Sequence, residues 1–319
     1  MDIFAIVLWP IKWAIEAILV GFHWLFTFAG LESEAGFTWV LSIAGLVVVV
    51  RAALIPVFVR QIKNQRKMLE ISPDLKKIQD KYKGKKDQFS REAMSRDTMA
   101  MYKKHGTNPL SSCLPILLQM PIFFGLFSVL NSSFQGLNGV GFLDEQLSRE
   151  FGRATLFGIA PLGSTMVTSD GNGWVIVIAA ILIVLMTASQ FITQLQIMSK
   201  NQSPEMKASP MFRQQRILLY LLPVVFLFSG IAFPLGVMFY WFVSNLWTMV
   251  QQFIVIRNLP TPGSEAALAR EARLDKQRQR RGIVEPDPEA PGALAVEEPK
   301  KAQRAQPVSK NRSKKKGGR

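Results

Sequence analysis

Cysteine, histidine and charge are all scarce in this sequence of 319 residues. The single cysteine, Cys113, excludes an internal disulfide and any multi-cysteine metal site. The two histidines, His23 and His105, are too few and too far apart in sequence to suggest a metal centre. We therefore expect neither a metal site nor another cofactor. Only 19% of the residues are charged, whereas 49% are hydrophobic.

Charge is almost missing from three long blocks, 37–59, 174–188 and 217–243, while Lys and Arg crowd the segments between them. A bilayer's hydrocarbon core is about 30 Å thick and takes about 20 apolar residues as a helix. The pattern therefore predicts an all-α, polytopic membrane protein. The expected transmembrane helices are 37–59, 109–131, 174–197, 217–230 and 233–256.

The N-terminal segment 1–36 leaves two alternatives open. Lys12, Glu16, His23 and Thr27 interrupt its apolar stretch, and at about 100° per residue they fall on one narrow stripe. One alternative is an amphipathic helix that lies in the membrane interface. The other is a spanning helix whose polar stripe faces protein.

The distribution of charge predicts the orientation. Segments 60–108, 198–216 and 257–319 carry net charges of +8, +3 and +8, whereas 132–173 carries −2. By the positive-inside rule the three basic segments are cytoplasmic and the acidic loop is extracytoplasmic. The protein is thus expected to lie in a bacterial cell membrane with its C-terminal tail in the cytoplasm.

Two of the segments expected in the cytoplasm differ in composition and in the structure that they predict. Segment 60–108 has apolar residues at roughly helical spacing, a break at Ser72 and Gly84 where a helix would end, which predicts a basic helical hairpin. The tail 257–319 is rich in Ala, Arg, Glu, Pro and Lys and is predicted to be disordered, although 264–281 could become helical on a partner. Both suit anionic lipids, and the tail also suits ribosomal RNA. For the hairpin, a charged, solvated topology signal is an equally simple explanation.

Arg51 is the one charge inside the span 37–59. An arginine facing lipid at such a depth costs at least about 2.5 kcal/mol, so we expect Arg51 to face water or polar groups inside the bundle. Polar residues that could surround it stand on the other spans, largely in their cytoplasmic halves: Gln119, Gln190, Gln194, Ser244, Asn245 and Thr248. One interpretation is a site that attracts an incoming negative charge. The other is an arginine permanently bonded to these groups, which would only lock the bundle.

Three stretches together resemble a known family. They are VRAALIPVFVRQIKNQRKMLEISPDLKKIQDKY, MYKKHGTNPLSSCLPILLQMPIFFGLFSVL and FPLGVMFYWFVSNLWTMVQQFIV. Over roughly 37–257 the chain resembles the YidC/Oxa1/Alb3 membrane protein insertases. The overall build, in which about 36 residues precede the first core span, looks most like that of a high-GC Gram-positive member.

The resemblance implies a five-transmembrane-helix core with a hydrophilic groove, which opens to the cytoplasm and to lipid and receives polar parts of a substrate. The implied groove residues are Arg51, Gln119, Gln190, Gln194, Asn245 and Thr248. The implied slide for the substrate's apolar segment comprises Pro115, Leu118, Ile122, Leu222 and Leu227. The implied partners are nascent membrane proteins, the SecYEG translocon, the ribosome, anionic lipids and the signal recognition machinery.

Two other function classes fit the sequence less well. A small anion channel or transporter would need a polar path through the outer half of the bundle as well, and the spans place most of their polar residues in cytoplasmic halves. A membrane enzyme would need a paired nucleophile and base or a ligand cluster such as H-E-x-x-H, and the spans offer none. We therefore expect the protein not to be an enzyme.

Overall fold

The structure is a computed structural model that describes residues 3–85, 87–107, 114–207, 216–217, 220–221, 225, 227–228 and 230–281, a few of them only by their backbone. Helices account for nearly all of its regular structure, which confirms the predicted all-α class. Its main helices are α1 (Ile3–Phe28), α2 (Gly36–Glu70), α3 (Ser72–Lys81), α4 (Gln88–Lys104), α5 (Leu114–Phe134), α6 (Glu145–Arg153), α7 (Gly173–Lys200), α8 (Pro204–Lys207), α10 (Leu235–Asn258) and α11 (Glu265–Arg280). Two short antiparallel strands, β1 (Thr155–Leu156) and β2 (Ala160–Pro161), form the sheet of the described part.

Four helices of the described part are long and apolar enough to cross a membrane. Their apolar stretches are Ile6–Phe28, Gly36–Asn64, Leu117–Phe134 and Gly173–Lys200. The long helix α10 is not among the four, because Ser, Asn, Thr and Gln lower the hydropathy of its second half. The predicted span 217–230 lies mostly outside the described residues.

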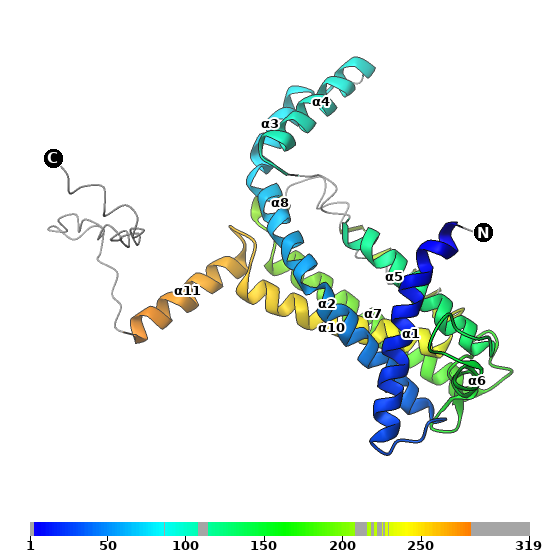
Figure 1. Ribbon diagram of the computed structural model, residues 1–319. Coiled ribbons are helices and arrows are strands. Elements are labelled where there is room, and N and C mark those ends of the chain that lie inside the picture. Colours follow the sequence, from blue (N-terminus) through cyan, green and yellow to red (C-terminus); the bar gives the residue numbers. More distant parts are fainter. Residues whose placement is uncertain are drawn as a thin grey trace, which may run out of the picture. The chain divides into compact units, whose positions relative to one another are not determined.

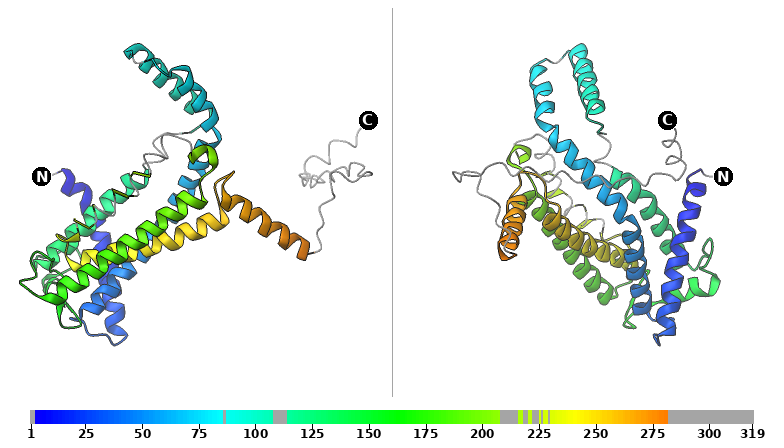
Figure 2. Two further views of the ribbon diagram at one scale, coloured as in Figure 1. Left: turned by 180° about the vertical axis from the view of Figure 1, so that it is seen from behind. Right: turned by 60° about the vertical axis from the view of Figure 1, so that its left-hand side comes forward.

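Helices α1, α2, α5, α7 and α10 form a bundle, with α2 packed on α1 and α10, α5 on α1, and α7 on α10 (Figures 1 and 2). At one end of this bundle, which we call the capped end, α1 turns into α2 and the segment 135–172 joins α5 to α7. At the other end, the hairpin end, α2 runs without a break past the expected boundary at residue 59 as far as Glu70.

The polar stripe of α1 faces protein. Glu16 and His23 are almost completely buried, with 1% and 3% of their surface exposed. His23 stacks on Trp39 of α2 with ring centroids 3.9 Å apart, and its Nε2 lies 3.0 Å from the backbone carbonyl oxygen of Ser33. These contacts agree with the second alternative for the N-terminal segment, a helix that belongs to the bundle.

An aromatic stack closes the capped end. Trp39 lies between His23 and Phe151 of α6, and Phe151 in turn contacts Phe134 at the end of α5. Trp39 and Phe151 are fully buried. Rings from four helices thus meet in one cluster. The cluster stabilises the fold both by the apolar surface that it buries and by the interactions between neighbouring rings.

The segment 135–172 is tied to the helices around it by backbone contacts. The amide of Gly236, at the start of α10, donates to the carbonyl oxygen of Leu162 at 2.9 Å. Gly36, at the start of α2, approaches Thr155 so closely that a Cβ there would lie 2.5 Å from the Thr155 carbonyl carbon. Glycine is therefore needed at position 36 for β1 to sit on α2.

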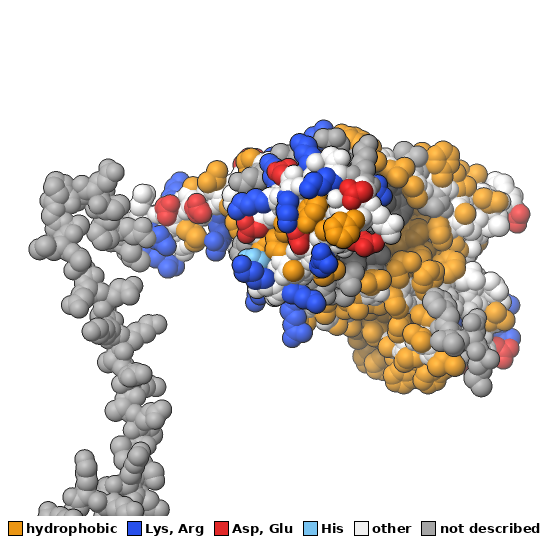
Figure 3. All heavy atoms as spheres, turned by 90° about the horizontal axis from the view of Figure 1, so that it is seen from above, with side chains coloured by type: hydrophobic (Ala, Val, Ile, Leu, Met, Phe, Trp, Pro, Cys, Tyr) orange, Lys and Arg blue, Asp and Glu red, His pale blue; other side chains and the backbone are white. Residues whose placement is uncertain are grey.

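The basic hairpin consists of α3 and α4, which pack through Ile71, Met101 and Tyr102. Asp97 of α4 accepts hydrogen bonds from Lys81 at 2.9 Å and from Tyr82 at 2.8 Å. The hydrogen bond from Lys81, and to a smaller extent that from Tyr82, holds the pKa of the Asp97 carboxyl below its ordinary value. The carboxylate therefore stays charged at neutral pH. Figure 3 shows many Lys and Arg side chains on the hairpin, whereas the helices behind it present mainly hydrophobic side chains.

Candidate functional site

Arg51 projects from α2 towards α10, where its guanidinium donates a hydrogen bond to the hydroxyl of Ser244. Arg51 is half-buried and Ser244 is buried, with 5% of its surface exposed. The Ser244 carbonyl also accepts from the hydroxyl of Thr248 one turn further along α10, at 2.8 Å. The arginine is thus bonded to a polar face of α10 and does not point at lipid. This was expected, because an arginine side chain is costly in lipid.

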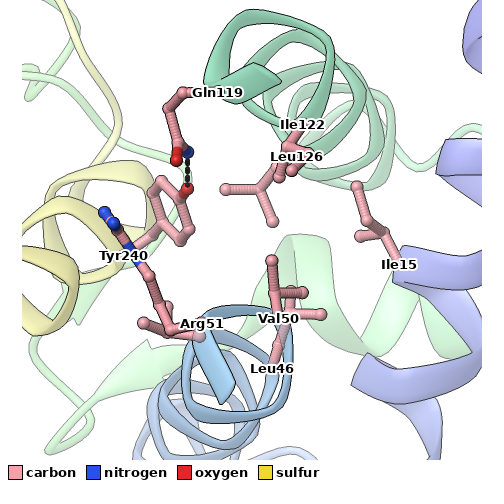
Figure 4. Close-up of a pocket in the computed structure, with 9 residues that line it drawn as sticks. Ile15, Leu46, Val50, Arg51, Gln119, Ile122, Leu126 and Tyr240 are labelled. Carbon is pink, nitrogen blue, oxygen red and sulfur yellow. Dashed lines mark hydrogen bonds between the residues drawn. The ribbon is translucent and has the colours of Figure 1, made fainter. Parts of the chain in front are cut away.

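A small cavity lies beside Arg51 and is bounded by α1, α2, α5 and α10 (Figure 4). One side of it is polar, where Gln119 of α5 donates a hydrogen bond to the Tyr240 hydroxyl at 3.2 Å and Arg51 lies beside them. The other side is apolar and includes Ile15 and Leu126. The cavity has room for about one water molecule and offers polar partners to hold it.

No carboxylate neutralises this arginine within the described part of the chain. The ion pairs recorded there are Lys77–Asp74, Lys81–Asp97, Arg149–Glu145 and Arg278–Asp275. An opposite charge a few ångströms away attracts far more strongly in such a half-buried setting than in water. Arg51 is therefore a positive charge that has a hydroxyl, and among the described residues no carboxylate, as its recorded partner.

The structure brings some of the predicted groove residues together and leaves others on neighbouring surfaces. Arg51 and Gln119 line the same cavity. Thr248 and Asn245 are half-buried on α10 next to Ser244, and Gln190 and Gln194 are half-buried on α7, towards the hairpin end.

The residues predicted to form the slide are described only in part. Ile122 lines the Arg51 cavity and Leu118 is half-buried one turn before it. Leu227 is exposed, with 52% of its surface accessible. Leu222 and the side chain of Pro115 lie outside what the structure describes. Ile122 therefore meets the cavity itself, not only the outer surface that a slide requires.

Tyr240 has a larger part in the site than the sequence predicted. It is not among the predicted groove residues, yet its hydroxyl accepts the Gln119 bond at the polar side of the cavity. Tyr240, Ser244 and Thr248 are four residues apart, a spacing that puts them on one face of a helix. This repeat of hydroxyl side chains was the signal in the sequence that could have found it.

Glu16 of α1 is a second polar centre, and its partner could not be identified from the sequence. Its carboxylate accepts hydrogen bonds from the backbone amides of Val140 at 2.8 Å and Gly141 at 2.7 Å, with the Leu143 amide at 3.5 Å. A Cβ on Gly139 would lie 2.5 Å from the carboxylate. Glu16 thus satisfies the amides of a loop that packs on an apolar helix, where free amides are costly.

The two halves of the bundle differ in how they are filled. The main core, with Leu19, Trp39, Leu130, Leu162 and Leu235 among its fully buried members, belongs to the capped half. In the hairpin half the buried groups of the described residues include polar ones, namely Gln61, Ser189, Thr193 and Ser244. The capped half also buries polar groups, among them Glu16, His23 and Ser42, so the feature that distinguishes it is its large apolar core.

Comparison with known proteins adds an independent observation. The family model described as "60Kd inner membrane protein" matches residues 30–262. The chain is 42% identical to the membrane protein insertase YidC of Tropheryma whipplei (strain Twist), across 97% of this chain and 96% of that protein. The YidC proteins of Streptomyces avermitilis (44% identical, 86% of this chain, 63% of that protein) and Bifidobacterium longum (34%, 97% and 95%) are also similar.

The family match takes in the helices that carry Arg51, Gln119 and Tyr240, and the resemblance seen in the sequence is confirmed. This chain belongs to the YidC/Oxa1 family of membrane protein insertases.

Proposed function

We propose that this protein inserts integral membrane proteins into a bacterial membrane by receiving a polar segment of the client beside Arg51. The observation that carries the proposal is a half-buried arginine in an apolar bundle, bonded to a hydroxyl and, among the described residues, to no carboxylate. Its relatives are named insertases, which agrees with this function.

The positions of the polar side chains in the bundle suggest the path of the client. A polar tail enters from the hairpin end, where Gln190, Gln194, Asn245 and Thr248 provide hydrogen-bonding partners that lipid lacks. Arg51 attracts its negative charge at the end of this polar region. The client's apolar segment meanwhile leaves water for lipid along α5, and the hydrophobic effect supplies the driving force. No covalent step and no nucleotide is required.

A closed far end distinguishes this function from that of an anion channel. Close aromatic packing around Trp39 and Phe151 fills the capped end, and this supports a groove that ends inside the bundle. The positive-inside rule puts the hairpin end in the cytoplasm and the capped end outside.

The basic hairpin and the basic C-terminal segment are proposed as cytoplasmic docking surfaces. Clusters of Lys and Arg bind anionic lipid headgroups and the phosphates of ribosomal RNA. Cooperation with the SecYEG translocon, the ribosome and the signal recognition machinery belongs to the same proposal.

Reconstitution into liposomes tests the function. We expect vesicles with this protein to insert a small one- or two-span client that empty vesicles insert poorly, and to retain an entrapped anionic dye. The matched control is the same client with vesicles that contain an unrelated helical membrane protein. Release of the dye without client insertion would favour the channel, and shortened client would indicate a protease.

A further inference from the structure

An exposed turn in the extracytoplasmic segment is built in an unusual way. Between β1 and β2, Phe157 and Gly158 have φ values of 53° and 72°, and the amide of Ile159 donates to the carbonyl oxygen of Leu156 at 3.1 Å. Two successive residues with positive φ form the tight hairpin turn in which Asn-Gly is the favoured pair. A bulky side chain in the first position is a rare outlier.

The side chain of Phe157, the residue in this strained conformation, is largely exposed and adds little to the packing of the fold. Phe157 is 75% exposed, whereas Leu156 before it is buried at 5%. Asparagine would suit the backbone better, and a polar side chain would suit water better. A strained and exposed aromatic residue therefore indicates a role outside the molecule.

The turn is bonded to the N-cap residue of α7, a helix that is apolar enough to span a membrane. Asn172 caps α7 by accepting from the amide of Trp174 at 3.0 Å, and its side-chain amide donates to the carbonyl oxygen of Ile159 at 2.8 Å. Trp174 and Ile159 are themselves exposed, at 58% and 38%. One asparagine thus holds the hairpin turn at the level of the first turn of α7.

We propose that Phe157, Ile159 and Trp174, which we call the turn belt, insert into the outer leaflet of the membrane at the boundary between headgroups and acyl chains. The belt continues the lipid-facing surface of α7, whose stretch Gly173–Lys200 is apolar enough to span. Tryptophan at the end of such a helix is typical of this depth.

The ligand is the apolar part of the lipid, not a headgroup charge. The turn belt carries no basic side chain, and the exposed carboxylate of Asp170 stands two residues before Asn172. Membrane insertion of the turn should therefore be the same in zwitterionic and in anionic vesicles. It would anchor the capped end to the bilayer surface while the hairpin end of the bundle handles the client.

Site-directed spin labelling of the full chain in liposomes tests the turn belt. In a Cys113→Ser background, a nitroxide is attached at Phe157→Cys, and its accessibility to oxygen and to a water-soluble nickel complex is measured. The matched control is Glu145→Cys, on α6 of the same segment, and Trp174→Cys is another position of the turn belt. Ile159→Cys provides a second probe of the belt if labelling at 157 disturbs the turn.

We expect oxygen to reach the label at 157 severalfold better than the nickel complex does, as at 174, and the reverse preference at 145. The ratio should not change when phosphatidylglycerol replaces phosphatidylcholine. Nickel access at 157 equal to that at 145 would show a water-facing turn and overturn the proposal. Low access to both reagents would show a protein contact, and it would overturn the proposal as well.

Discussion

Insertion of clients with acidic translocated tails is expected to fall about tenfold or more when Arg51 is replaced by alanine. At an effective dielectric constant of about 20, opposite charges about 4 Å apart attract by about 4 kcal/mol. If only about 1.4 kcal/mol of this attraction lowers the barrier to transfer, the rate changes about tenfold. Clients with neutral tails should be inserted at nearly the normal rate, so the ratio between the two clients in reconstituted vesicles is the quantity to measure.

Two further substitutions separate the charge of Arg51 from its hydrogen bond to Ser244. Arg51→Lys keeps the positive charge and should largely restore insertion of acidic-tailed clients. Arg51→Gln keeps a hydrogen-bond donor without the charge and should resemble alanine. If glutamine restored insertion as well as lysine does, Arg51 would only lock α2 to α10, and its electrostatic role would be refuted.

Replacement of Glu16 by alanine is expected to destabilise the folded protein by about 1–3 kcal/mol, because it removes the charged acceptor of at least two partly buried backbone amides. These are the amides of Val140 and Gly141, which the carboxylate now binds at 2.8 and 2.7 Å. The change in the free energy of unfolding is measured on the protein in detergent, by heating it or by titrating it with dodecyl sulfate.

Lys12→Met is the matched control for Glu16, since it also removes one charge from α1, one turn earlier. It should leave stability nearly unchanged, while Glu16→Gln, which retains one oxygen acceptor, should fall between control and alanine. Equal unfolding of Glu16→Ala and Lys12→Met would mean that the carboxylate does not anchor the loop.

Features governed by nearby residues could be predicted from the sequence. The turn at Gly84 and the start of α4 after Asp87 follow local rules, and the structure shows Asp87 accepting a hydrogen bond from the amide of Ser90 at 2.8 Å. An arginine is costly in lipid, so Arg51 was predicted to face polar groups inside the bundle. The hydrogen bond from Arg51 to Ser244 of α10 agrees with this expectation.

Features that depend on distant residues could not be predicted. Glu16 stood out only as an interruption in an apolar stretch, because its partners are backbone amides about 125 positions away, which leave no mark on side-chain pattern. The same holds for segment 135–172, where β1 rests on Gly36 and Leu162 pairs with Gly236. Tyr240 was not among the predicted groove residues, because its partner Gln119 is 121 positions away in the sequence.

The most direct test of the account is the reactivity of cysteines along α5 towards a negatively charged methanethiosulfonate that does not cross membranes. In a Cys113→Ser background, Gln119→Cys lies at the Arg51 cavity, and Val129→Cys lies in the apolar core. We predict that position 119 reacts from the cytoplasmic side alone, more slowly when Arg51 is replaced by glutamine, and that position 129 reacts from neither side. A cysteine at 119 that never reacts, or one at 129 that reacts from outside, would contradict a wet cationic site closed towards the exterior.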